Sequence, residues 1–97
     1  MNIQSKINKL CIALKTKGQT YLIDRKQYYN KELSKVCTSI KINRLMPVEE
    51  YNKLFPDNKK DENKYDYIKV EVFSSGSNIK VLKKLVELYK EVSEMDE

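Results

Sequence analysis

The stretch RKQYYNKELSKVCTSIKINR, residues 25–44, holds the densest group of side chains that could take part in chemistry. It carries six cations against one acid, and two tyrosines stand side by side within it. Lysine and arginine bind phosphate oxygens, and an exposed tyrosine ring can stack on a base. The pattern therefore predicts a surface that binds nucleic acid. Its candidate contacts are Arg25, Lys26, Tyr28, Lys31, Lys35, Lys41 and Arg44.

A second candidate for anion binding lies in SSGSNIKVLKK, residues 74–84, at the predicted start of the last helix. The first N–H groups of a helix lack partners within the helix and attract anions, and nearby lysines would add positive charge. The candidate residues are Ser75, Ser77, Lys80, Lys83 and Lys84. The same pattern also fits an ordinary N-cap followed by surface lysines, and this alternative stays open.

Histidine is absent from the sequence, and Gly18 and Gly76 are the only glycines. The chain therefore lacks the commonest general base and a frequent zinc ligand, and it cannot form a glycine-rich phosphate loop. No other residues pair at a spacing typical of a catalytic site. We expect a protein that is not an enzyme and that binds no cofactor and no metal.

The cysteines Cys11 and Cys37 are too few for a disulfide framework, and we expect both to be reduced thiols. No apolar run approaches the ~18 residues of a membrane-spanning helix, and the polar N-terminus does not resemble a secretory signal. We therefore expect a cytoplasmic protein that makes no contact with a membrane.

Two stretches show the period of an amphipathic helix. Residues 2–17 repeat apolar side chains every three or four positions, and Gly18 can end this helix. Residues 79–92 carry a second apolar stripe, which predicts a helix that runs to about residue 94.

Four stretches are predicted strands: residues 20–24, 26–30, 35–46 and 67–73. In the third, Val36, Thr38, Ile40 and Ile42 alternate with more polar residues. This period of two predicts that these four side chains face the core. Neighbouring residues of a strand face opposite sides. We therefore expect one of Tyr28 and Tyr29 on the basic surface and the other in the core.

Pro47 and Pro56 bound a predicted short helix, and DNKKDENK, residues 57–64, is a predicted solvated loop. The length is that of one domain, residues 1–97. Together the elements predict an α+β fold, in which an N-terminal and a C-terminal helix pack on a three- or four-stranded antiparallel sheet. A winged-helix variant is the alternative, and it requires residues 26–35 to be helical.

Positive charge is concentrated in the first half of the chain. Residues 1–46 hold ten Lys and Arg against two acids, and residues 47–97 hold nine against twelve, for a net charge of +5. One interpretation is the solvated surface of a lysine-rich chain, because net charge alone governs solubility. The other is that the basic half, including the lysines of the first helix, binds DNA and releases counterions. Halves of opposite charge would also allow two copies to associate as a homodimer.

Three segments resemble a family of small proteins carried by phages, conjugative plasmids and integrative elements of Firmicutes, chiefly clostridia. The segments are KQYYNKELSKVCTSIKI, MPVEEYNKLFPDNKKDENKYDYIKVEVFSS and NIKVLKKLVELYKE, which cover most of residues 19–92. The family pattern falls on Gln27, Tyr28, Tyr29, Thr38, Glu71, Phe73, Ile79, Val81 and Leu82. These positions are structural in type, so the resemblance implies no reaction.

Small basic proteins on such elements are often DNA-binding accessories of replication, transfer or transcription. The resemblance therefore implies a non-enzymatic DNA-binding accessory that uses the basic hairpin. The alternative is a protein-binding module, such as an anti-defence or host-modulating phage inhibitor. Its working surface would lie around Tyr51, Phe55 and Tyr67.

Overall fold

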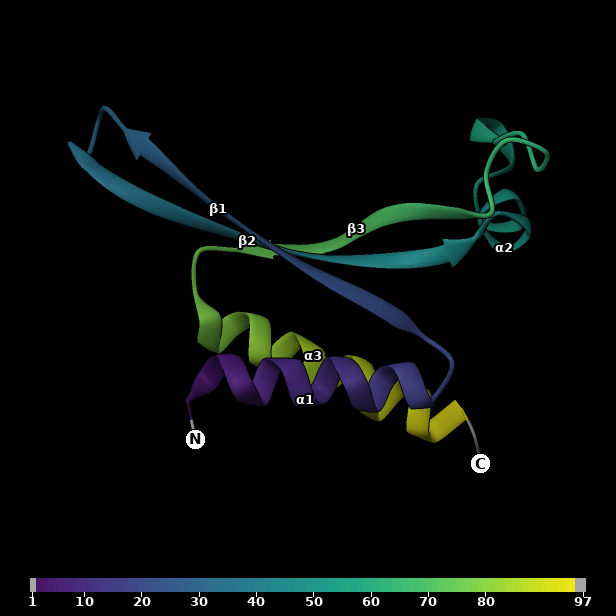
Figure 1. Ribbon diagram of the computed structural model, residues 1–97, viewed down its shortest axis with the longest axis horizontal. Helices are drawn as coiled ribbons and strands as arrows, with labels where there is room; N and C mark the ends of the chain where they lie inside the picture. The colour runs from purple at the N-terminus through teal and green to yellow at the C-terminus, as the bar shows by residue number, and fades with distance from the viewer. Residues whose placement is uncertain (1, 96–97) are drawn as a thin grey trace.

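Two long helices cover one face of an antiparallel sheet in the computed structural model, which describes residues 2–95 (Figure 1). In chain order the elements are α1 (Ile3–Thr16), β1 (Thr20–Asn30), β2 (Lys35–Pro47), α2 (Val48–Leu54), a 3-10 turn (Pro56–Asn58), β3 (Tyr67–Ser75) and α3 (Asn78–Met95). The strands lie in the order β1-β2-β3, with both neighbouring pairs antiparallel. The predicted α+β fold is confirmed. A winged helix would require residues 26–35 to be helical. These residues instead form strands and a turn.

Local signals account for both ends of α1. The Asn2 side chain acts as N-cap, because its Oδ1 accepts a hydrogen bond from the Ser5 N–H at 2.9 Å. At the other end Gly18 has a φ of 88°, the left-handed conformation that glycine tolerates best. The Gln19 N–H then donates to the Leu14 carbonyl at 3.0 Å. The tight reversal places the C-terminal end of α1 beside the start of β1.

β1 is one strand of eleven residues rather than the two short strands predicted for this stretch. Every residue from Thr20 to Asn30 is paired with a residue of β2. The cations Arg25 and Lys26 interrupt the apolar pattern of the sequence but not the pairing, because backbone N–H and C=O groups make the ladder. Within residues 2–95 the sheet therefore has three strands.

The core lies between the sheet and the two long helices. Its fully buried members are Ile7 and Leu14 of α1, Ile40 and Ile42 of β2, and Val81 and Leu85 of α3. The even-numbered residues of β2 thus face the helices, as the alternation predicted, and the odd-numbered residues face the open side of the sheet.

Phe73 also packs against this core, although strict alternation from Ile68 and Val70 along β3 would place it on the opposite face. β3 holds an irregularity beside β2: Ile42 is paired with Phe73, and the next residue, Asn43, is paired with Glu71. One extra residue, Val72, is thereby left without a partner on β2. Such a bulge changes which side chains share a face, so strict alternation fails across it.

Residues 26–39, which we call the arm, project beyond the helix layer as the outer part of the β1–β2 hairpin (Figure 1). β3 is paired with β2 only from Ile40 onward, so the arm is a two-stranded ribbon. Tyr29 is 61% and Val36 is 63% exposed, although both point to the helix side. Val36, Thr38 and one of the two tyrosines were predicted to lie in the core. This is wrong: Thr38 and both tyrosines are exposed as well, because the helices do not extend beneath the arm.

The arm and the α2 region make the molecule long. Its radius of gyration is 15.6 Å, whereas a compact domain of this length has about 12.5 Å. None of the described helices is both long and apolar enough to cross a lipid bilayer.

Candidate nucleic-acid interface

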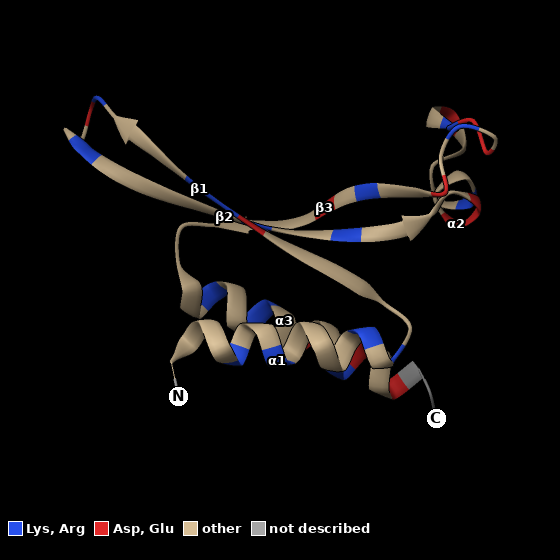
Figure 2. Cartoon of the chain, viewed as in Figure 1, with Lys and Arg blue, Asp and Glu red and all other residues tan. Residues whose placement is uncertain are grey.

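Four candidate contacts share the open side of the sheet, which is turned away from α1 and α3. They are Lys26 and Tyr28 on β1, and Lys35 and Lys41 on β2. The register pairs Lys26 with Ser39 and Tyr28 with Cys37, and paired residues lie on the same face. Lys31 lies in the turn at the tip of the arm. We define these five residues as the basic face; Figure 2 shows the blue segments at the tip and along the arm.

The lysines of the arm are exposed and unpaired. Lys26, Lys31 and Lys35 make no ion pair or hydrogen bond through their side chains with any of the described residues. Tyr28 presents 46% of its surface to solvent between them. A phosphate could therefore bind these groups without first breaking a contact within the protein.

Lys41 differs from the other lysines of the basic face because it has a partner. Its Nζ lies 3.4 Å from Glu71 Oε1, and both side chains are about half exposed. An exposed pair of this kind contributes little to stability and is screened by salt. Lys41 can therefore exchange Glu71 for a phosphate at a small cost.

Asp24 places a negative charge at the inner end of the basic face. Its Oδ2 accepts a hydrogen bond from Asn43 Nδ2 at 2.6 Å and lies 2.8 Å from Lys69 Nζ, so the cluster crosses all three strands. The hydrogen bond from Lys69 holds the pKa of Asp24 below its ordinary value. The ionised carboxylate opposes a phosphate beside Lys41. Two acids thus reduce the attraction for anions along the arm: Asp24 at its inner end and Glu32, which lies beside Lys31 in the turn at the tip.

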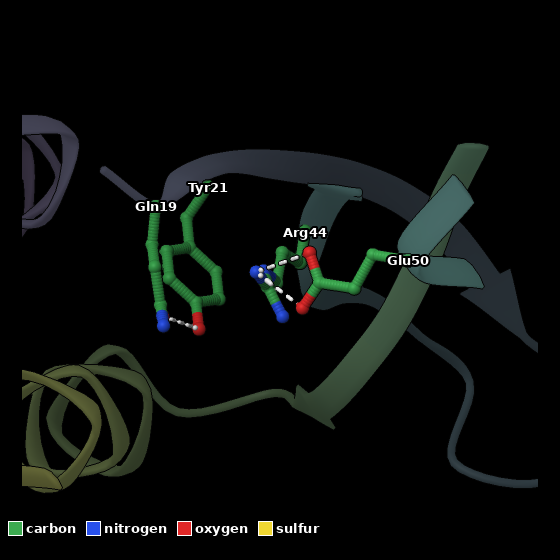
Figure 3. Close-up of polar contacts among 4 residues, drawn as sticks. All are labelled: Gln19, Tyr21, Arg44 and Glu50. Carbon is green, nitrogen blue, oxygen red and sulfur yellow. Dashed lines mark hydrogen bonds and ion pairs between the residues drawn. The ribbon is translucent and has the colours of Figure 1, made fainter. Parts of the chain in front are cut away.

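Arg44 was a predicted phosphate contact, but the structure places it on the helix side and pairs it with an acid. Its Nη2 lies 3.1 Å from both carboxylate oxygens of Glu50 (Figure 3). Only 17% of the Arg44 side chain is exposed. Burial raises the pKa of the adjacent Tyr21, and the charge of Arg44 partly opposes this shift. Arg44 thus ties β2 to α2, and a phosphate would have to compete with Glu50 for it.

Arg25 also points to the helix side, where Ile40 is its partner on β2. Its Nη2 lies 3.5 Å from Asn78 Oδ1 at the start of α3. The structure therefore separates both arginines from the lysines of the basic face. The lysines of α1 are separated as well, because α1 packs beneath the other side of the sheet (Figure 1).

The serines of the predicted anion site serve as hydrogen-bond acceptors for the backbone. Ser77 Oγ accepts from the Lys80 N–H at 3.4 Å, and Ser75 Oγ accepts from the Ser77 N–H at 3.1 Å. The candidate lysines, Lys80, Lys83 and Lys84, line one shallow hollow with Phe73 and Glu87. Two N–H groups that an anion would need are thus already bonded, which fits the N-cap interpretation.

An aromatic hollow of about 620 Å³ lies at the other end of the sheet, between β3 and the α2 region. Its rings are Tyr51, Phe55, Tyr65 and Tyr67. The centroids of Tyr51 and Phe55 are 4.8 Å apart. The sequence pattern did not predict Tyr65 as a member. Its position depends on how the loop after α2 folds back. Two hydrogen bonds hold this loop: the Lys60 N–H donates to Asn52 Oδ1 at 2.8 Å, and Asn52 Nδ2 donates to the Lys60 carbonyl at 3.0 Å.

Other kinds of site find little support in the described residues. Within residues 2–95, no three His, Cys, Asp or Glu side chains are grouped so that they could hold a metal ion. Cys11 and Cys37 are free, and burial raises the pKa of the Cys11 thiol. No family model, curated protein or solved structure matches the chain.

Proposed function

We propose that this protein binds DNA through the basic face of the arm, as a non-enzymatic accessory of a mobile genetic element. The observation that carries the proposal is the grouping of unpaired, exposed lysines with Tyr28 on one face of a projecting ribbon. Phosphate contacts supply most of the affinity of proteins for DNA, and lysine supplies such contacts without reading sequence.

The spacing of the cations suits a phosphate backbone. Lys41 is paired with Asp24, and Lys35 is paired with Asn30, which lies six residues further along β1. At a strand rise of about 3.3 Å, the basic face is about 20 Å long. This is roughly six nucleotide steps along one DNA strand. Several lysines can therefore contact successive phosphates at the same time.

Tyr28 adds a polar ring between the lysines. Its hydroxyl can donate to a phosphate, and its ring can stack on an unpaired base. The resemblance to mobile-element proteins supports a role in replication, transfer or transcription. Because none of these groups reads base edges in a fixed geometry, we expect weak sequence preference.

A salt titration of a labelled duplex tests this proposal. If four lysines of the basic face contact phosphates, log affinity should fall against log salt with a slope of about −3.6. The same measurement on a single strand shows whether stacking by Tyr28 adds to binding. Absence of binding at low salt, or a slope near zero, would contradict the proposal.

Protein binding is the second candidate, and the aromatic hollow favours it. Tyrosine and phenylalanine are enriched in protein interfaces, and the hollow adjoins β3, an edge strand that could accept an extended peptide. In that case replacing Phe55, which is 40% exposed, would abolish partner capture. The change should leave the salt-dependent affinity for DNA as it is in the wild type.

A further inference from the structure

β1 is an edge strand over its whole length. β2 is paired with one side of it, and within the described chain no helix or loop backbone bonds to its other side. Such an edge offers unpaired N–H and C=O groups to a further strand. The side chains of β1 determine which strand can pair there.

The sequence of β1 is complementary to itself in one antiparallel register. With Arg25 on a twofold axis, Asp24 lies opposite Lys26 of the second copy. On the same open face, Leu22 lies opposite Tyr28 of the second copy, and these two residues are 40% and 46% exposed in the single chain. Symmetry forms each contact twice. We propose that two copies of this chain associate by pairing β1 with β1 in this register, which makes a six-stranded sheet.

The adjacent registers are less favourable. In an antiparallel pair, residues directly opposite each other have their side chains on the same face of the sheet. A twofold axis that keeps both helix layers on one side must therefore set one residue of β1 opposite the same residue of the second copy. An axis at Lys26 would set Lys26 against itself, whereas an axis at Asp24 would set two carboxylates against each other. The Arg25 register also sets two positive charges, Arg25 of each copy, opposite each other at the axis. Arg25 Nη2, however, lies toward Asn78 Oδ1 on the helix side, at 3.5 Å.

A hollow beside β1 supports the same register independently of these charges. Cys11, Ile12, Tyr21 and Leu22 line about 210 Å³ between α1 and the edge of β1. Ile12 is 64% exposed there. In the Arg25 register, Tyr29 of the second copy lies opposite Tyr21 and on its helix side. Pairing would therefore bring two exposed apolar side chains, Ile12 and Tyr29, out of water together.

The pairing leaves Lys31, Lys35 and Lys41 of the basic face open, whereas Lys26 and Tyr28 lie opposite Asp24 and Leu22 of the second copy. Both helix layers lie on one side of the six-stranded sheet, and the two basic faces lie on the other, with the arm tips at opposite ends. The dimer does not depend on DNA binding. Failure of one proposal therefore does not decide the other.

Charge reversal at Lys26 tests the register by its effect on the dimer. Lys26→Glu sets a carboxylate against Asp24 at two symmetric positions, and we expect the dimer dissociation constant from sedimentation to rise about tenfold or more. Lys35→Glu is the matched control, because it makes the same charge change on the same face but away from the edge. We expect it to change the constant by less than about twofold.

Cross-linking tests the position of the axis. In Arg25→Cys the two introduced side chains would have Cβ atoms about 4.5–5.5 Å apart, close enough for a disulfide after small adjustment. In Gln27→Cys, on the same face, the two equivalent residues would be about 13 Å apart. We expect a covalent dimer from the first variant and wild-type levels from the second. Equal cross-linking, a monomer at every concentration, or equal weakening by Lys35→Glu would overturn the proposal.

Discussion

Replacing Ile42 with alanine is expected to lower the free energy of unfolding by about 2–5 kcal/mol. Ile42 is fully buried on the central strand, between Ile23 of β1 and Phe73 of β3. These neighbours are held by their own strands, so they can fill the resulting cavity only in part. For a domain of this length, each kcal/mol corresponds to about 4–8 °C in Tm. Urea denaturation followed by circular dichroism measures the loss.

Val36→Ala is the matched control for this prediction. Val36 lies on the same strand and the same face as Ile42, and it is also β-branched, but it is 63% exposed. Its replacement removes little buried apolar surface, and we expect a loss below about 1 kcal/mol. Losses of equal size at the two positions would mean that the arm is packed against something in solution.

Neutralising the arm is expected to have the largest effect on DNA binding. The triple variant Lys26→Gln, Lys31→Gln and Lys35→Gln removes three unpaired cations from the basic face. We expect the affinity at low salt to fall about tenfold to a hundredfold and the slope against salt to become shallower by about three. Tm should stay near the wild-type value, because these side chains make no hydrogen bond or ion pair with the described residues.

A second triple variant separates location from net charge. Lys6→Gln, Lys9→Gln and Lys15→Gln also lower the net charge of +5 by three, but they lie on α1, beneath the other side of the sheet. Glutamine and lysine have similar helix propensities, so α1 should remain intact. We expect less than a threefold loss of affinity for DNA, which is roughly the change that the lower net charge of the whole protein would produce. Equal losses in the two triple variants would indicate non-specific attraction by net charge.

The layers of the fold could be predicted from the sequence because periodicity reports which way side chains point. The apolar stripes of residues 2–17 and 79–92 correspond to α1 and α3, and the alternation of residues 35–46 corresponds to β2. Burial could not be predicted in the same way. Val36 points toward the helix side as expected. It is nevertheless exposed, because burial depends on how far α1 and α3 extend beneath the strand.

The candidate site was predictable only in part, for a related reason. Lys26, Tyr28, Lys35 and Lys41 share a face, as strand alternation and hairpin pairing require. Arg44 carries the same charge, but Glu50 on α2 neutralises it, and the strand-to-helix geometry that brings them together has no signature in the local pattern. The contact of Asp24 with Lys69 likewise joins residues far apart in the chain.

The central claim, that DNA binds the open face of the arm, is tested most directly by two adjacent residues. Tyr28 and Tyr29 are both exposed, and they point to opposite faces of β1. Replacing each in turn with the photoreactive residue p-azidophenylalanine and irradiating the protein with a labelled duplex compares the two faces within one hairpin. We predict strong cross-linking to DNA from position 28 and only background from position 29. Equal yields from both positions, or a higher yield from position 29, would contradict the account.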